Sequence, residues 1–185
     1  MGVAAVRHWM SPQEYLAGEL TAEVKHEYVD GEVFAMVGAS RRHSRIIHNL
    51  ILRLDPTARK RGCNSHSTDV KLRVAAANAY YYPDFVVACD KGDRDEYVIE
   101  APALIAEVLS PSTEAVDRRE KRVNYGKIPS LMEYLTVAQD RRRVEVWRRG
   151  EEGLRVAVYE SGSFRLNSLD CEVALDDIYA DLEGV

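Results

Sequence analysis

Residues 80–88, YYYPDFVVA, and residues 104–113, LIAEVLSPST, decide the fold of this 185-residue chain. Both runs are rich in side chains that β-strands favour, and each contains one acid, Asp84 or Glu107. Removing a carboxylate from water inside an apolar strand costs several kcal/mol unless the group is paired or binds a cation. We therefore expect the two strands to pair and to bring both acids to a divalent metal site. Pro83 cannot donate a ladder hydrogen bond, so the first strand, which we take as the central one, should bend beside Asp84.

The remaining segments predict an α+β, α/β-like protein with a mixed central sheet flanked by helices. Ser11 and Glu14 form a capping-box pattern ahead of a first helix, and Ser40 caps a longer helix with an apolar stripe. Asp-Gly at 30–31, between two β-prone runs, predicts a tight hairpin. The sequence has no repeat, low-complexity segment or linker, so we expect residues 1–185 to form one domain. Further strands are expected at residues 131–137, 144–147 and 154–159.

A third helix is expected from about residue 114 to Tyr125. Ser-Pro-Ser-Thr at 110–113 ends the second acidic strand and supplies the cap. Asp117 and Lys121 fall on one face of this helix at i and i+4. An ordinary surface pair, worth about 0.3 kcal/mol, is the alternative interpretation of these two residues.

Several motifs spread along the chain resemble a known family. They are Pro83-Asp84, residues 107–113, Asp117, Lys121 and Tyr125, together with residues 26–33, His43, residues 67–71 and residues 133–135. In combination they resemble the Uma2 group of restriction-endonuclease-like proteins, a branch of the PD-(D/E)xK nuclease superfamily. The resemblance implies a restriction-endonuclease-like fold and hydrolysis of nucleic-acid phosphodiester bonds that depends on Mg²⁺ or Mn²⁺.

The resemblance also implies roles for individual residues. Asp84 and Glu107, with the carbonyl group of Val108, would hold the cation, which prefers oxygen ligands. The superfamily pattern has a lysine two residues after the second acid, where this chain has Leu109. Lys121 would then supply the catalytic ammonium group from the following helix.

Three further residues are candidates for the same site. Glu27 lies in the first strand of the hairpin, where it is either an exposed acid facing Lys25 or, as the resemblance implies, a third carboxylate at the metal. His43 is a candidate for contact with substrate phosphate or water, although a lone histidine is more often a hydrogen-bonded boundary residue. Asp117 is the third candidate.

The charge balance limits how nucleic acid could bind. The net charge of -5 and the pI near 5.6 argue against a protein that coats nucleic acid by bulk electrostatics. A local basic groove at Arg118 and Arg122 is expected to contact nucleic acid, with DNA preferred, although such a cluster is also typical of a solvated face. Because a nuclease that cuts both strands of a duplex often acts as a dimer, we expect this chain to form a homodimer.

Other features bear on compartment and on competing functions. No apolar run approaches the roughly 20 residues that cross a bilayer, and residues 1–10 lack a signal-peptide core, so we expect a cytoplasmic protein without membrane contact. Cys63, Cys89 and Cys171 are expected to be buried reduced thiols. The sequence has no glycine-rich phosphate loop, Gly-x-Ser-x-Gly elbow or His-x-x-x-His pair, which excludes three common hydrolase types.

Two alternative functions stay open at this point. The first is a catalytically inactive nucleic-acid-binding module of the same fold, which the leucine at position 109 favours. The second is a hydrolase of another phosphorylated small molecule, which the negative net charge favours.

Overall fold

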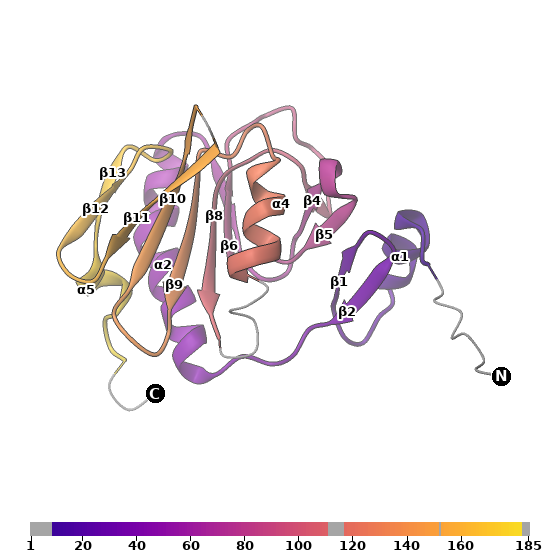
Figure 1. The fold of residues 1–185 in the computed structure, drawn as a ribbon, viewed down its shortest axis with the longest axis horizontal. Coiled ribbons are helices and arrows are strands. Elements are labelled where there is room, and N and C mark those ends of the chain that lie inside the picture. Colours follow the sequence, from indigo (N-terminus) through magenta and orange to yellow (C-terminus); the bar gives the residue numbers. More distant parts are fainter. Residues whose placement is uncertain (1–8, 111–116, 152, 183–185) are drawn as a thin grey trace.

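The computed structural model describes residues 9–110, 117–151 and 153–182 (Figure 1). Within these residues, one mixed sheet has the strand order β11 (Gly153–Tyr159), β10 (Val144–Gly150), β9 (Glu133–Ala138), β8 (Pro102–Leu109), β6 (Phe85–Ala88) and β3 (Asn64–His66). A second sheet has the order β2 (Glu32–Ala35), β1 (His26–Val29), β5 (Ala79–Tyr81), β4 (Lys71–Val74) and β7 (Val98–Ile99). Strands β12 (Ser163–Leu166) and β13 (Cys171–Ala174) pair separately. The expected α+β class is confirmed.

The helices lie around these sheets. They are α1 (Pro12–Glu19), α2 (Arg41–Lys60), the 3₁₀ helix η1 (Ala75–Ala77), the π-helical turn η2 (Asp117–Lys121), α4 (Arg122–Gly126) and α5 (Leu175–Ile178). In Figure 1, α2 and α4 lie on different sides of the β8–β6 region. The described helices include none with the length and apolarity that crossing a membrane would require.

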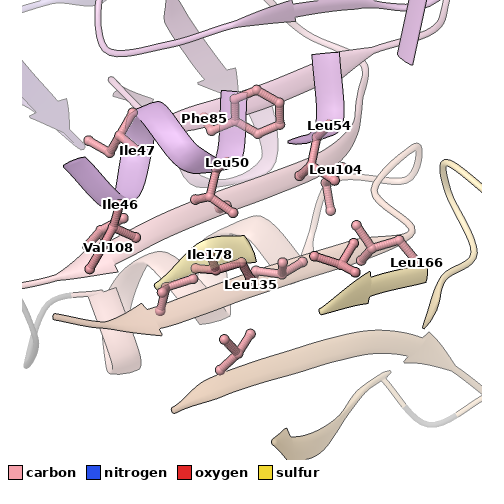
Figure 2. Close-up of a cluster of buried hydrophobic side chains, with 14 of the residues drawn as sticks. Ile46, Ile47, Leu50, Leu54, Phe85, Leu104, Val108, Leu135, Leu166 and Ile178 are labelled. Carbon is pink, nitrogen blue, oxygen red and sulfur yellow. The ribbon is translucent and has the colours of Figure 1, made fainter. Parts of the chain in front are cut away.

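The strand β8 is buried on both faces of the six-stranded sheet, since its side chains alternate between the faces and nearly all of them are buried. Leu104, Ala106 and Val108 point to one face, where the apolar stripe of α2 and the short helix α5 cover them (Figure 2). Ile105 points to the other face and packs in a second cluster with Tyr125 from α4. Glu107 lies on this second face, and the site described below is built there.

Local sequence signals place α1, α2 and the hairpin correctly. Ser11 and Glu14 form the expected capping box of α1, and the Ser40 hydroxyl accepts a hydrogen bond at the start of α2. The β1–β2 turn has positive φ at Asp30 and Gly31, a conformation that glycine adopts without steric cost. In Figure 1 this hairpin and α1 lie at the edge of the molecule, and β1 joins the second sheet through β5.

The expectation of one central strand over residues 80–88 is wrong. The run forms β5 and β6, which belong to different sheets, and Pro83 lies in the connection between them. The strand β6 is second from one edge of its sheet, between β3 and β8, and β8 is nearer the centre, between β6 and β9. The proline therefore does more than bend a strand, because the chain passes from one sheet to the other there.

The expectation of three reduced thiols is also wrong for two of the cysteines. Cys63 and Cys89 form a disulfide, with their Cα atoms 4.2 Å apart. The reason is the antiparallel pairing of β3 with β6, in which Asn64 lies opposite Ala88, so the two flanking cysteines face each other. Cys171 is a free thiol, as expected.

Candidate active site

The two strand acids are neighbours. Antiparallel pairing of β6 with β8 sets Phe85 opposite Ala106, so Asp84 lies beside Glu107. Backbone groups hold both carboxylates, since Val108 N donates to Asp84 Oδ2 at 2.7 Å and Asp84 N donates to Glu107 Oε2 at 3.3 Å. The strands therefore pair as the sequence predicts, and each carboxylate is fixed by the backbone of the opposite strand.

Lys121 reaches the same acids from the η2 turn. Its Nζ lies 3.3 Å from Glu107 Oε1 and 2.9 Å from Glu27 Oε1 on β1, and it lies over the Tyr81 ring, 5.5 Å from the centroid. The side chains of Lys121 and Glu107 are only 8% and 4% exposed. Two carboxylates and a ring face therefore stabilise a buried ammonium group. Glu27 is fixed in turn, because its Oε1 accepts a hydrogen bond from Tyr82 N at 3.2 Å.

A buried tyrosine completes the surroundings of Glu107. The Tyr125 hydroxyl donates to Glu107 Oε1 at 2.8 Å, and its ring packs edge-on against Tyr81 and Tyr134. Burial first, and the Glu107 charge second, raise the pKa of Tyr125 well above its ordinary value. The phenol therefore stays neutral and remains a donor to the carboxylate. The sequence pattern includes Tyr125 in a motif without assigning it a role. Its i+4 spacing from Lys121 nevertheless predicts that the two side chains lie on the same face of the helix.

His43 approaches the site from the first turn of α2. Its Nε2 lies 3.3 Å from Asp84 Oδ2, and its side chain is almost fully buried. The Ser40 hydroxyl accepts a hydrogen bond from His43 N at 3.1 Å, so the cap that starts the helix also sets the position of the histidine.

One cleft collects these groups. It has a volume of about 1070 Å³ and is lined by Glu27, His43, Asp84, Glu107, Val108 and Lys121, five different segments of the chain contributing. Apolar side chains that include Phe34, Met36 and Ile51 also line it. The cleft therefore combines a charged wall with apolar surface.

The remaining predicted site residues lie elsewhere or cannot be placed. The side chains of Asp117 and Arg118 are outside the described part of the structure. Arg122 packs its guanidinium group on the Trp147 ring, 4.7 Å from the centroid, and is not among the described residues that line the cleft. Its expected contact with nucleic acid stays a prediction.

The donor set at Asp84 and Glu107 suits a hard cation. In the described part of the chain no group of three or more His, Cys, Asp or Glu side chains is arranged around a common metal position. Mg²⁺ is commonly held by one or two carboxylates, with water and substrate phosphates as its other ligands. Carboxylate oxygens are the ligands that such a cation prefers, and a backbone N–H group holds one oxygen of each acid in place. The two acids therefore fit Mg²⁺ or Mn²⁺.

Comparisons with known proteins find similar sequences and a similar structure. The model of the Uma2 family, described as "Putative restriction endonuclease", matches residues 12–178. The "Uncharacterized protein slr1290" of Synechocystis sp. is 35% identical over 176 residues, which cover 94% of this chain and 93% of that protein. A second uncharacterized protein of that organism, sll1609, is 34% identical over 152 residues, covering 80% and 86%.

A solved structure shows the same fold. It is the crystal structure of a "putative nuclease" from Anabaena variabilis, which superposes with a TM-score of 0.77 at 15% identity. The match covers 94% of this chain and 99% of that one, so the likeness extends over nearly the whole architecture.

Proposed function

Since the chain belongs to the Uma2 family of putative restriction endonucleases, we propose that it is a nuclease that hydrolyses phosphodiester bonds of nucleic acid, with DNA as the preferred substrate. The observation that supports this most strongly is the meeting of Asp84, Glu107 and Lys121, from three separate elements, in one cleft. Paired acids can hold a divalent cation, and such a cation together with the ammonium group can bind a phosphate and neutralise its charge.

Asp84 and Glu107 would hold Mg²⁺ or Mn²⁺, with the Val108 carbonyl as a further oxygen. Such a cation, when bound, polarises a phosphoryl oxygen and makes a coordinated water more acidic. The protein itself keeps the two carboxylates in register, because each accepts a hydrogen bond from the backbone of the other strand.

Lys121 would stabilise the negative charge that develops on the phosphoryl oxygens in the transition state. Its two carboxylate partners hold the ammonium group in place before substrate arrives, so little reorganisation is needed at the moment of reaction. Glu27 acts here as a positioning residue. His43, beside Asp84, would contact the attacking water or the phosphate.

A cleavage screen tests the proposal. Supercoiled plasmid, single- and double-stranded oligonucleotides and RNA are incubated with Mg²⁺, with Mn²⁺ or with EDTA, beside Asp84→Asn and the control Asp140→Asn, whose carboxylate is 67% exposed in a surface turn. We expect metal-dependent cleavage by wild type and by the control but not by Asp84→Asn. Binding without cleavage would select the inactive binding module, and cleavage of small phosphodiesters alone would select the small-molecule hydrolase.

The cation is tested separately by titrating Mn²⁺ calorimetrically into wild type, Asp84→Ala and Glu107→Ala. We expect each substitution to weaken binding, because each removes one carboxylate ligand. Equal affinities for all three proteins would remove the metal from the proposal.

A further inference from the structure

One lysine whose side chain is largely covered has no role in the site described above. Lys71 begins β4 and is only 6% exposed. Within the described ranges, its Nζ makes no ion pair or hydrogen bond, and its recorded contact is with the Tyr82 ring, 5.4 Å from the centroid. A lysine that is covered to this extent keeps little of the hydration of its charge, and a ring face offsets the loss only in part. The arrangement is therefore suited to receiving an anion.

A second ammonium group lies next to the same ring. Lys25 Nζ is 5.7 Å from the Tyr82 centroid and donates to the Thr68 carbonyl group at 3.0 Å. It also pairs with Asp69, whose side chain is 75% exposed. An exposed ion pair contributes little stability, so a phosphate group can displace this carboxylate.

The aromatic ring that both lysines contact is held by its neighbours. Antiparallel pairing of β4 with β5 sets Leu72 opposite Tyr81, which brings Lys71 level with Tyr82. The Tyr82 hydroxyl donates to Glu19 Oε1 at 3.0 Å, and Glu19 is also bound by His26 through its backbone N at 2.8 Å. Glu19 therefore already has partners of its own.

Lys25 and the ring that both lysines contact are part of the candidate active-site cleft. Lys25, Thr68 and Tyr82 line the same cleft as Asp84, and Tyr82 is two residues from Asp84 in the connection between the sheets. Two residues of extended chain span about 6.6 Å. A ligand in the cleft that reaches Asp84 with one phosphate group can therefore place another near Tyr82.

We propose that Lys71, together with Lys25, binds a phosphate group of the ligand at a position separate from the reacting phosphate. This deepens the proposed function, because for a nucleic acid the bound group is a neighbouring phosphate of the same strand. The phosphate site itself does not depend on cleavage. Asp69 acts as a competing anion for Lys25 in the absence of ligand.

The test measures affinity without turnover. A fluorescent single-stranded DNA is titrated in EDTA at several NaCl concentrations, with Lys71→Met, Lys71→Arg, Asp69→Asn and Arg73→Met. Arg73 is the matched control, since it lies two residues further along β4 and is already paired with Glu100 at 2.6 Å. The slope of log affinity against log salt falls by about 0.7 for each lost phosphate contact to a single strand.

We expect Lys71→Met to weaken binding several-fold and to lower that slope by about 0.7. Lys71→Arg and Arg73→Met should keep the wild-type slope, and Asp69→Asn should bind more tightly. If Lys71→Met folds poorly, the other two variants still test the proposal. Lys71→Arg must keep the wild-type slope, and Asp69→Asn must bind the DNA more tightly than wild type. A wild-type slope in Lys71→Met, or unchanged affinity in Asp69→Asn, overturns the proposal.

A second measurement identifies the source of the phosphate. Inorganic pyrophosphate should raise the melting temperature of wild type more than that of Lys71→Met. If pyrophosphate does so but no oligonucleotide binds, the phosphate site stands and its ligand is a small molecule. If wild type cleaves DNA while neither probe responds to Lys71→Met, the nuclease proposal stands and this inference fails.

Discussion

Two buried glutamates on neighbouring strands, Glu107 on β8 and Glu133 on β9, have different surroundings. Glu133 is fully engaged, since its Oε1 accepts from Arg148 Nε and Asn167 N at 3.1 Å each. Its Oε2 accepts from Ser168 N at 3.0 Å and from Ser168 Oγ at 2.7 Å. These bonds tie the segment after β12 to the central sheet, so Glu133 acts as a structural cross-link.

Glu107 is equally buried but shares its carboxylate with reactive groups. Its partners include the Lys121 ammonium group and the Tyr125 hydroxyl, and it lines the cleft, which Glu133 does not among the described residues. Burial of an acid therefore does not identify a catalytic site. The kind of partner and the access to a cleft distinguish the two glutamates.

The largest effect on stability is expected at Glu133. Replacing it by alanine leaves the Arg148 guanidinium group and the Ser168 backbone without their acceptor, and breaking a buried pair in this way costs about 3 kcal/mol or more. Urea unfolding measures the loss.

Glu107→Gln, which still offers an amide oxygen to Tyr125, should change the unfolding free energy by about 1 kcal/mol or less while abolishing cleavage. Equal losses of stability in both variants would contradict the distinction.

Removing the ammonium group beside Glu107 should mainly affect catalysis. If Lys121 stabilises charge that develops only in the transition state, Lys121→Met lowers turnover about 100-fold or more, some 2.7 kcal/mol. Lys121→Arg should restore activity only in part, because a planar guanidinium does not replace a compact ammonium group. Leu109→Lys in the Lys121→Met background tests whether the two positions reach one site. Turnover is measured on protein whose fold is confirmed by circular dichroism, and wild-type turnover in Lys121→Met would refute the role.

A smaller effect is expected from Tyr125→Phe, which removes the hydroxyl donor from Glu107. A hydrogen bond to a charged group contributes about 1.5 kcal/mol, so we expect roughly a tenfold loss of turnover with substrate affinity nearly unchanged. The control is Tyr28→Phe, another buried tyrosine, whose hydroxyl donates to the backbone carbonyl group of Met10 and not to a carboxylate. If both variants lose the same activity, Tyr125 has no special role in positioning Glu107.

The sequence predicts the local elements well because their signals are local. Ser11, Ser40 and the Asp30-Gly31 pair mark a helix cap or a turn within a few residues. The division of residues 80–88 between two sheets was missed because the apolar run is continuous and strand pairing is decided by distant segments. The Cys63–Cys89 disulfide was missed for the same reason, since only the β3–β6 register brings the two thiols together.

The site was predicted in part. Asp84 and Glu107 follow from the physical cost of acids in apolar strands, whereas Lys121 was named only because a family resemblance supplied a reason to look for it. The cost of burying an acid does not by itself separate Glu107 from Glu133, because both are acids in apolar runs and differ in their partners. Lys71 ends one of the motifs that carry the resemblance, but its lack of an ion pair is a property of the folded sheet and has no signal in the sequence.

The smallest expected effect is a loss of stability at alkaline pH, caused by the ionisation of Tyr179, which lies outside the candidate site. The Tyr179 hydroxyl donates to the Arg143 carbonyl group at 2.8 Å, near the turn between β9 and β10. Burial raises the pKa of Tyr179 from 10.0 to about 12. Because the folded pKa lies above the unfolded one, this contribution to stability is complete below pH 10 and is lost as the pH rises from 10 towards 12. Melting temperatures of wild type should therefore fall over that interval, and those of Tyr179→Phe should fall less steeply, while tyrosinate absorbance reports the ionisation. An identical pH dependence in the two proteins would contradict the assignment, and constant melting temperatures from pH 7 to 9 are expected for both.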